Sequence, residues 1–177
     1  KMPQLHHLSP VGDDLSKWRF KLKNFDNDCD GGRNLNKDLK QLASKHGQDH
    51  LLMEAYFPPN YPAAPFFLRM VTPRCQWYTG HVTAGGSICI EVLTQTGSPH
   101  SWNSTMCFES IINTVMLNML HCEVYQVQTA TGPGGLAGPL RVDLNRRYCY
   151  NVMQEYSVFE AQSAFERMLS HHRANGW

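Results

Sequence analysis

Charged and bulky apolar side chains alternate along the run from Lys17 to Lys23. A period of two residues is typical of a strand with one wet face and one buried face. Two further apolar runs, at residues 50–57 and 66–71, flank a proline-rich turn from Pro58 to Pro62. The pattern therefore predicts three consecutive antiparallel strands.

A helical period follows the first of these strands. The residues that recur at helical spacing are Leu35, Leu39, Leu42, Ala43 and His46. They predict a short amphipathic helix over residues 35–46, with Asn34 or Asn36 as the N-cap and Gly47 as the stop. Residues 24–33 are rich in Asp, Asn and Gly and are predicted to form the loop that leads into it.

Two longer apolar stripes at helical spacing occupy the second half of the chain. The first consists of Phe108, Ile111, Ile112, Val115, Met119 and Leu120 and predicts a central core helix. The second consists of Val158, Ala161, Phe165, Met168 and Leu169 and predicts a helix over residues 155–172. Residues 129–139 are rich in Gly and Pro and predict a loop between the two helices.

Strands in the first part of the chain and helices in the second predict an α+β domain, with helices packed on an antiparallel sheet. A chain of 177 residues is about right for one domain, so we expect residues 1–177 to form a single domain. Residues 72–105 show little periodicity and contain the glycine pair Gly85 and Gly86. Such a long irregular stretch inside a compact domain usually has a function.

Composition narrows the classes of function. Apolar residues make up 42% of the chain, charged residues 18%, and the formal net charge is +1. This near-neutral balance predicts neither a nucleic-acid partner nor binding to a membrane surface. No apolar run approaches the roughly 20 residues that span a bilayer, and no secretory signal opens the chain. Because the first residue is Lys1 rather than Met, we expect the sequence to be a fragment of a longer protein.

The six cysteines are widely scattered: Cys29, Cys75, Cys89, Cys107, Cys122 and Cys149. None forms a Cys-x-x-Cys pair, and the nine histidines add no paired ligand spacing, so the sequence predicts no metal site and no cofactor. A domain of this size does not need a disulfide framework, and reduced thiols favour the cytoplasm or the nucleus. Cys107 and Cys122 fall near the core-helix stripe and are predicted to be buried filler.

Four motifs resemble those of the ubiquitin-conjugating enzymes and occur in that family's order. The family's active-site segment is similar to residues 85–93, which contain Cys89. Its first hairpin is similar to residues 12–18, and its FPxxYPxxP loop is similar to residues 57–65. Trp102, 13 residues after the cysteine, precedes the core helix as the family's tryptophan does.

Within this family, the chain resembles the Q-type branch. That branch has a helical insertion between its second and third strands, which matches residues 35–46, and an active-site segment close to residues 85–93. Its Asn-Gly-Trp ending matches Asn175, Gly176 and Trp177. The resemblance covers nearly the whole sequence. It implies the ubiquitin-conjugating-enzyme fold, an antiparallel sheet of about four strands packed by helices.

The activity that the resemblance implies consists of two acyl transfers. Cys89 would accept ubiquitin from an activating enzyme as a thioester, and an acceptor amine or hydroxyl would then attack that thioester, in some cases with a ubiquitin ligase. Two alternatives stay open at this point. One is a non-catalytic ubiquitin-binding or scaffold variant of the fold, although Cys89 is present here. The other is a conjugating enzyme for a different ubiquitin-like modifier.

Cys89 is the predicted nucleophile, because it lies beside two glycines in a long irregular stretch. Most of the family carries a His-Pro-Asn tripeptide that begins ten residues before the active cysteine. Here the corresponding residues are Thr79, Gly80 and His81, so His81 takes the place of the asparagine. The imidazole of His81 could donate to an oxyanion or order the loop, or could simply be a loop side chain with its tip in water.

Four further residues complete the predicted site. Glu91 stands where the family often has Asp, and would either orient an acceptor or be a solvated edge carboxylate. Pro62, Ala63 and Trp102 form the predicted partner-binding set, in which Trp102 mainly packs the active-site loop. Because Ala63 lacks the bulky aromatic residue that the family often presents there, we expect weak ligase binding through that loop.

Overall fold

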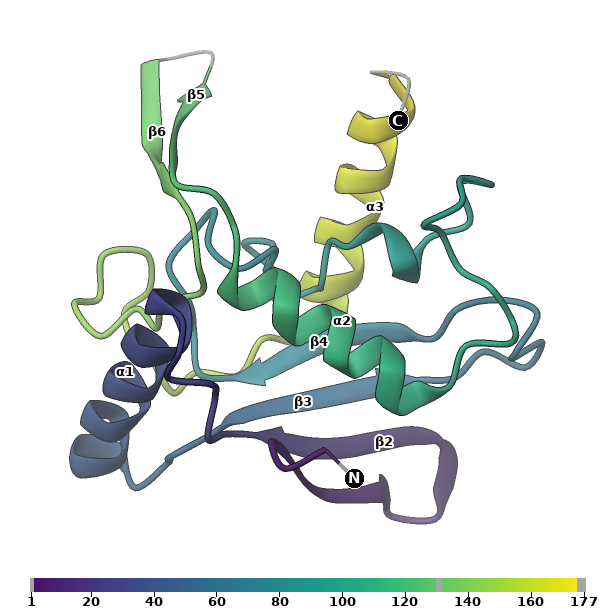
Figure 1. The fold of residues 1–177 in the computed structure, drawn as a ribbon, viewed down its shortest axis with the longest axis horizontal. Helices are drawn as coiled ribbons and strands as arrows, with labels where there is room; N and C mark the ends of the chain where they lie inside the picture. Colours follow the sequence, from purple (N-terminus) through teal and green to yellow (C-terminus); the bar gives the residue numbers. More distant parts are fainter. Residues whose placement is uncertain (1, 130–131, 175–177) are drawn as a thin grey trace.

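The computed structural model describes residues 2–129 and 132–174. Its strands are β1 (Leu5–Val11), β2 (Asp14–Leu22), β3 (Leu51–Tyr56), β4 (Phe67–Thr72), β5 (Tyr125–Thr129) and β6 (Gly132–Ala137). Its helices are α1 (Asp30–His46), α2 (Phe108–Leu120), α3 (Val158–Ala174) and a short 3-10 helix, η1 (Glu91–Leu93). Strands β1 to β4 form one antiparallel sheet in chain order, and α2 crosses one face of it (Figure 1). The predicted α+β class, with four antiparallel strands and a helix inserted between the second and third, is confirmed.

Alternation along β2 sorts its side chains between the two faces of the sheet. Phe20 and Leu22 are buried in the core, where the Phe20 ring meets α2. On the opposite face, Arg19 reaches the buried carboxylate of Glu54 on β3, with 2.6 Å between Nε and Oε2. Arg69 on β4 binds the other oxygen of Glu54 at 2.6 Å. The buried charge of Glu54 is thus paired on both sides, as burial of a carboxylate requires.

Helix α1 stands at one end of the sheet (Figure 1) and packs as the sequence predicts. Leu35, Leu39 and Leu42 are buried in the core. Gly47 ends the helix in the left-handed conformation, with φ 76°. At the other end Cys29 is the N-cap, and its sulfur accepts a hydrogen bond from the backbone of the first turn. The leucine face predicted from helical spacing is therefore confirmed, whereas Ala43 is half-buried and His46 is exposed.

The start of α1 differs from the prediction. The helix begins at Asp30, so the predicted loop over residues 24–33 is wrong in its last part, and the cap is not Asn34 or Asn36. A Cβ on Gly31 would lie 2.0 Å from the backbone oxygen of the last residue of α2. Close approach to α2 therefore requires glycine in the first turn, and this glycine-rich stretch is helical in spite of its composition.

Helix α2 covers the predicted core stripe. Its buried residues are Ile111, Ile112, Val115, Met116, Met119 and Leu120. The prediction that Cys107 and Cys122 are buried filler is wrong, because Cys107 is exposed and Cys122 is only half-buried. Cys107 is the N-cap of α2, and Cys122 lies just after the helix has ended. Both cysteines lie outside the helix proper, where the period of the stripe no longer decides burial.

A β-hairpin occupies much of the segment that is predicted to be a loop over residues 129–139. Strands β5 and β6 pair antiparallel, from Tyr125 opposite Ala137 to Thr129 opposite Gly132. Gly and Pro disfavour the interior of a sheet, but an isolated two-stranded ribbon consists of edge strands and tolerates them. The hairpin and α3 project from the same side of the molecule (Figure 1).

Helix α3 begins at Val158, somewhat later than predicted. Ser157 and Glu160 form a capping box: the Glu160 N–H donates to Ser157 Oγ at 3.1 Å, and the Ser157 N–H donates to Glu160 Oε2 at 3.3 Å. Only Ala161 and Ala164 are buried, and the rest of the predicted apolar stripe is half-buried, because the helix projects from the domain. Across residues 2–129 and 132–174, no helix is long and apolar enough to cross a membrane.

Candidate active site

Cys89 lies at the end of a tight backbone turn. Val82 and Ile88 pair across this turn as an antiparallel bridge. The Cys89 N–H donates to the backbone carbonyl of His81 at 2.8 Å. The turn therefore holds two of the predicted site residues opposite one another, although they lie on different sides of the glycine pair.

The glycine pair in this turn is required by packing against the start of α3. A Cβ on Gly85 would lie 2.3 Å from the backbone oxygen of Glu160. Gly86 has φ +89°, and a Cβ there would lie 2.4 Å from the ring of Tyr156. Any larger residue at either position would push α3 away from the turn, so the Gly-Gly sequence fixes the path of the backbone that leads to Cys89.

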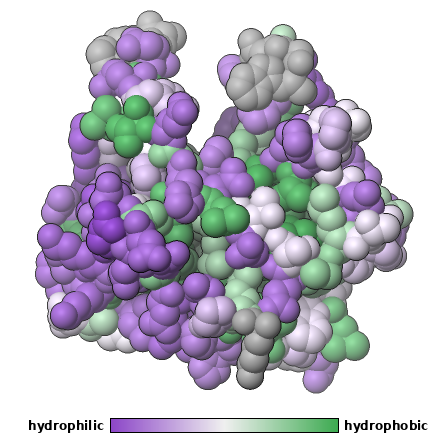
Figure 2. Space-filling model, in the orientation of Figure 1, coloured by the Kyte–Doolittle hydropathy of each residue, from purple (hydrophilic) through white to green (hydrophobic). Residues whose placement is uncertain are grey.

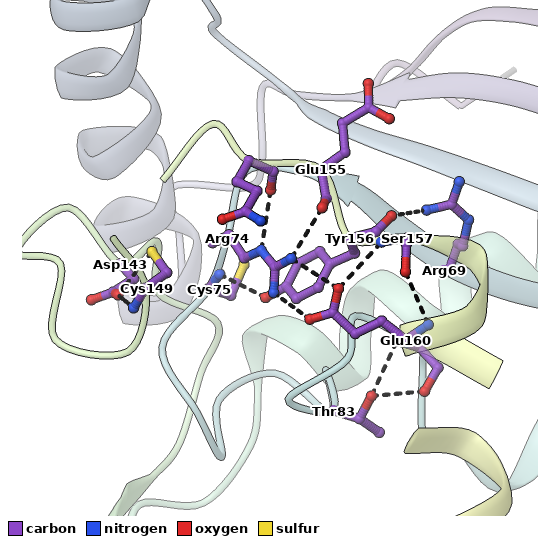
Figure 3. A network of polar contacts seen from close by, with 12 residues as sticks. Arg69, Arg74, Cys75, Thr83, Asp143, Cys149, Glu155, Tyr156, Ser157 and Glu160 are labelled. Carbon is purple, nitrogen blue, oxygen red and sulfur yellow. Dashed lines mark hydrogen bonds and ion pairs between the residues drawn. The ribbon is translucent and has the colours of Figure 1, made fainter. Parts of the chain in front are cut away.

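Arg74 anchors the same end of α3 (Figure 3). Its guanidinium binds both carboxylate oxygens of Glu160, at 2.5 and 2.9 Å, and lies 4.1 Å from the centroid of the Tyr156 ring. The Tyr156 hydroxyl accepts a hydrogen bond from the Cys75 N–H at 3.0 Å. Charge, hydrogen bonding and ring contact therefore converge on the residues against which the glycine pair packs.

Cys89 opens onto a cleft of about 830 Å³ between the β5–β6 hairpin and α3. Tyr125 at the base of the hairpin lines one side, and Met168 and His172 on α3 line the other. Asn118 on α2 contributes to the wall as well. Figure 2 shows the hollow between the two projections, with apolar surface at its base.

The surroundings of Cys89 favour the neutral thiol. The residue is half-buried, and burial raises the pKa of the Cys89 thiol to about 11. No lysine or arginine is among the described residues that line the cleft, so no nearby cation offsets the burial. In the free protein at neutral pH, the thiol is therefore protonated almost completely.

His81 lines the same cleft as Cys89. Its backbone has φ 56°, a conformation that residues other than glycine adopt rarely. Desolvation lowers the pKa of the His81 imidazole below 6.5, and a contact with the backbone of Cys89 opposes this shift only in part. The lowered pKa therefore favours the neutral form of the His81 ring at pH 7. The structure brings His81 and Cys89 together, and the catalytic role of His81 stays a prediction.

Glu91, the first residue of η1, also lines the cleft. Its Oε1 accepts hydrogen bonds from the hydroxyl of Ser98 and, at 3.4 Å, from that of Thr96. One oxygen of the carboxylate is thereby tied to the turn at residues 96–98. The side chain is exposed, so its other oxygen can still meet an acceptor in the cleft.

Pro62, Ala63 and Trp102 lie together, outside the cysteine cleft. The Trp102 indole donates from Nε1 to the Pro62 carbonyl at 2.9 Å, and its ring packs 6.0 Å from that of Phe66, centroid to centroid. Gln95 donates to the Ala63 carbonyl at 2.9 Å. The tryptophan therefore joins the proline-rich loop to the segment after η1, which is the packing role that the sequence predicts. Ala63 is exposed at the tip of this loop.

Most of the chain is similar to ubiquitin-conjugating enzymes of the Q type. No family model matches the chain. Ubiquitin-conjugating enzyme E2 Q1 of Homo sapiens is 30% identical over 167 residues, which are 94% of this chain and 32% of that protein. A second protein of Homo sapiens, named as Q-like among the ubiquitin-conjugating enzymes, is 26% identical over 167 residues, which are 94% of this chain and 83% of that protein. The chain is a relative of the Q-type ubiquitin-conjugating enzymes.

The similarity to the Q-type enzymes extends beyond mammals. Ubiquitin-conjugating enzyme E2 25 of Caenorhabditis elegans is 29% identical over 165 residues, which are 93% of this chain and 35% of that protein. The chain thus spans about a third of the length of E2 Q1 and E2 25. The fold and the inserted helix agree with the resemblance seen in the sequence, whereas Asn175, Gly176 and Trp177 lie outside the described residues.

Several residues of the cleft were not singled out from the sequence. They are Thr94, Thr96, His100, Thr114, Asn118, Tyr125 and His172. Thr114 and Asn118 lie four residues apart beside the apolar stripe of α2, so helical spacing could have placed them on one polar edge. The others come from separate loops and elements, and only the tertiary fold brings them together. No group of three metal-ligating side chains occurs within residues 2–129 and 132–174.

Proposed function

We propose that this chain acts as a ubiquitin-conjugating enzyme in which Cys89 carries ubiquitin as a thioester. The observation that carries the proposal is the place of Cys89, the one cysteine among the described residues lining the cleft between the hairpin and α3. Relatives that match 94% of the chain are named ubiquitin-conjugating enzymes, which supports the same assignment. We further propose that the chain is a single catalytic domain that acts in the cytoplasm or the nucleus.

In the first transfer, the Cys89 sulfur attacks the carbonyl carbon of the ubiquitin thioester held by an activating enzyme. A C–S bond to Cys89 forms and the C–S bond to the activating enzyme breaks, while the Cys89 proton passes to the departing thiolate or to water. Because the pKa of Cys89 is about 11 in the free protein, the thiol must lose its proton within the complex.

In the second transfer, an acceptor amine or hydroxyl attacks the Cys89 thioester. A C–N or C–O bond forms, the carbonyl oxygen becomes an oxyanion, and the C–S bond then breaks as that charge returns to the carbonyl. The Cys89 thiolate leaves and takes up the proton that the acceptor gives up. A thiolate of high basicity is a poor leaving group, so the raised pKa of Cys89 would slow the loss of ubiquitin to water.

His81 and Glu91 are proposed to act in this second transfer. A neutral His81 ring can donate one N–H to the oxyanion, or it can keep the turn in place through its contacts with Cys89. The exposed oxygen of Glu91 can accept from an incoming ammonium group and orient it toward the thioester. The proposed partners are ubiquitin, its activating enzyme and a ligase.

Ligase binding is proposed to be weak at the loop that contains Pro62 and Ala63. Both residues are exposed, and the Trp102 bond to the Pro62 carbonyl holds the loop in one shape. A methyl group offers little area compared with the aromatic anchors that dominate interfaces. Replacing Ala63 with phenylalanine would therefore strengthen binding to ligases that use this loop.

A charging assay tests the proposal. The protein is incubated with ubiquitin-activating enzyme, ATP and ubiquitin, and an adduct that is lost on thiol reduction is expected. Cys89→Ala should abolish the adduct, Cys89→Ser should replace it with an oxyester that resists reduction, and the control Cys107→Ala should charge normally, because Cys107 is exposed outside the cleft.

Two outcomes would replace the proposal with one of the alternatives. Absence of any adduct, with ubiquitin bound non-covalently, would indicate a ubiquitin-binding or scaffold role. Charging with another ubiquitin-like modifier and its own activating enzyme, but not with ubiquitin, would show that the chemistry is correct and the modifier is different. An adduct that persists in Cys89→Ala would assign the nucleophile to another cysteine.

A further inference from the structure

The hydroxyl groups of the threonines in the cysteine cleft are already engaged. Thr94 donates to the Glu91 carbonyl at 2.7 Å, and Thr96 donates to the Glu91 carboxylate at 3.4 Å. Thr114 donates to the carbonyl of Ser110, one turn earlier in α2, at 3.1 Å. A hydroxyl has one hydrogen to donate, so none of these three can donate to an oxyanion without breaking an existing bond.

Asn118 differs from these residues because its amide has two N–H groups. One of them donates to the Thr114 carbonyl at 2.9 Å. That bond fixes the amide on α2 while the side chain lines the cleft. Among the described residues, neither the second N–H nor the side-chain oxygen has a hydrogen-bond partner. Asn118 therefore combines a fixed position, partial burial and a free donor beside the cleft.

The backbone of Asn118 is linked to the turn that carries Cys89. The Cys122 thiol donates to the Asn118 carbonyl at 2.7 Å. The Cys122 sulfur also lies beside the backbone N–H groups of Gly80 and His81, which oppose the effect of burial on its pKa. The His81 carbonyl in turn accepts the Cys89 N–H at 2.8 Å. Three contacts thus connect Asn118 to Cys89 by way of Cys122 and His81.

We propose that Asn118 is a catalytic residue that donates its free N–H to the oxyanion formed when an acceptor attacks the Cys89 thioester. The proposal rests on the function proposed above. Its chemistry adds no step: the acceptor forms its bond to the carbonyl carbon, the oxygen gains the charge that Asn118 meets, and the C–S bond then breaks. A donor held on a helix before the reaction needs no reorganisation when the charge develops.

An amide donor has a property that an imidazole lacks. It does not titrate in the pH range of the reaction, so the contribution of Asn118 to the rate is the same on both sides of the imidazole pKa. His81, whose ring titrates below pH 6.5, would give a contribution that changes with pH. The pH profile therefore distinguishes a donor at Asn118 from one at His81.

The test is single-turnover discharge of the ubiquitin thioester on Cys89 to free lysine. Asn118→Ala should lower the maximal rate by about 100-fold, the usual effect of losing one oxyanion donor, without changing the KM for lysine or the extent of charging. Asn118→Asp, which has the same shape but presents only acceptors, should be at least as slow. The control Asn113→Ala, on the exposed face of the same helix, should discharge at the normal rate.

A fold defect is excluded by a second variant. Asn118→Ser keeps a hydroxyl that can bond to the Thr114 carbonyl, as Thr114 itself bonds to Ser110, but it has no second donor. It should melt near the wild-type temperature and discharge as slowly as Asn118→Ala, by the same factor at pH 6 and pH 8. Normal discharge in a folded, charged Asn118→Ala or Asn118→Ser protein would overturn the assignment of Asn118. Failure of the wild-type protein to charge would instead overturn the function proposed above.

Discussion

At the scale of single residues, Cys89 and Cys107 show how environment decides the chemistry of a thiol. Burial raises the pKa of Cys89 to about 11. The hydroxyl and the backbone N–H of Ser110 lower the pKa of the exposed Cys107. Since the thiolate is the reactive form, the cysteine in the cleft is the less reactive of the two toward small reagents.

The first prediction follows from this contrast. At pH 7.5, iodoacetamide should alkylate Cys107 at least about tenfold faster than Cys89, because a larger fraction of Cys107 is thiolate and its sulfur is exposed. Peptide mass spectrometry over time measures both rates in one sample. Ser110→Ala should slow the alkylation of Cys107 and leave the alkylation rate of Cys89 unchanged. Equal rates for the two cysteines in the wild-type protein would contradict the assigned environments.

The second prediction concerns His81. Desolvation lowers its pKa below 6.5, so the folded protein binds this proton less tightly than the unfolded chain does. This difference in proton binding favours the unfolded chain only where that chain is protonated, which is below about pH 6.5. The free energy of unfolding should therefore decrease as the pH drops from 7 to 5. His81→Asn should remove this component, with a shallower decline of the melting temperature over the same range. If the melting temperature of His81→Asn declines as steeply as that of the wild-type protein, His81 makes no contribution to the pH dependence of stability.

Two substitutions of His81, to alanine and to asparagine, test its part in catalysis. If the ring donates to the oxyanion, His81→Ala should slow discharge from Cys89 by about 100-fold and charging much less, and His81→Asn should restore part of the rate. If His81 only orders the turn, the loss in His81→Ala should be much smaller. Single-turnover discharge at pH 6 and pH 8 separates the two cases, and normal discharge in His81→Ala would exclude both.

The sequence was informative about the residues of the cleft that lie close together along the chain. Cys89, His81 and Glu91 belong to one motif, so spacing from a family pattern was enough to find them. Asn118 and His172 belong to helices far away in the chain, and no spacing rule connects them with the cysteine. Their places depend on how α2 and α3 pack, which the pattern of apolar positions does not determine.

At the scale of elements, the inserted helix α1 is joined to the domain by charge as well as by its leucine face. Asp38 is buried and binds Arg141 through two hydrogen bonds, of 2.7 and 2.8 Å. It also accepts the Val142 N–H at 3.1 Å. The helix therefore belongs to the folded core, and the apolar and polar contacts act on the same face.

The third prediction tests that packing. Leu39 is 3% exposed, so Leu39→Asp would bury a charge without a partner and should lower the free energy of unfolding by roughly 2 kcal/mol or more. The control Lys40→Asp changes the next residue, which is exposed, and should have a much smaller effect. Urea unfolding of both variants measures the difference. Equal stability would show that α1 contributes little to the core.

Elements with a regular period were predicted correctly, and elements made of glycine and proline were not. Strands β2, β3 and β4, helix α2 and the leucine face of α1 follow directly from apolar runs, alternation or helical spacing, whereas β1 was expected only from the resemblance to the family's first hairpin. The first turn of α1 and the β5–β6 hairpin have a loop-like composition, and they are ordered by contacts that composition does not show. Gly31 lies in the first turn of α1, where the close approach of α2 leaves no room for a side chain. The start of α3 was predicted at residue 155, before its true start at Val158, although Ser157 and Glu160 have the spacing of a capping box that would have located it.

At the scale of the whole molecule, one cluster connects the sheet, the cysteine turn and α3 (Figure 3). Arg74 follows β4, Glu160 lies in the first turn of α3, and Tyr156 packs against Gly86 in the turn that leads to Cys89. Movement of α3 relative to the sheet would therefore move one wall of the cleft and release the turn. The ion pair between Arg74 and Glu160 is partly buried, with side chains 13% and 35% exposed, so solvent screens it only in part.

The last prediction separates this ion pair from the capping box that shares Glu160. Glutamine also serves at the third position of a capping box, so Glu160→Gln should keep the start of α3 while removing the charge that Arg74 binds. We expect a loss of about 1–2 kcal/mol in the free energy of unfolding, since a charged hydrogen bond becomes neutral and Arg74 loses its partner in a partly buried site. Hydrogen exchange in the first turns of α3 and alkylation of Cys89 should both become faster, because the wall of the cleft loosens. The matched control Glu166→Gln changes an exposed glutamate on the same helix and should leave all three measurements unchanged. Equal behaviour of the two variants would show that the glycine and tyrosine contacts hold α3 against the cysteine turn without the ion pair.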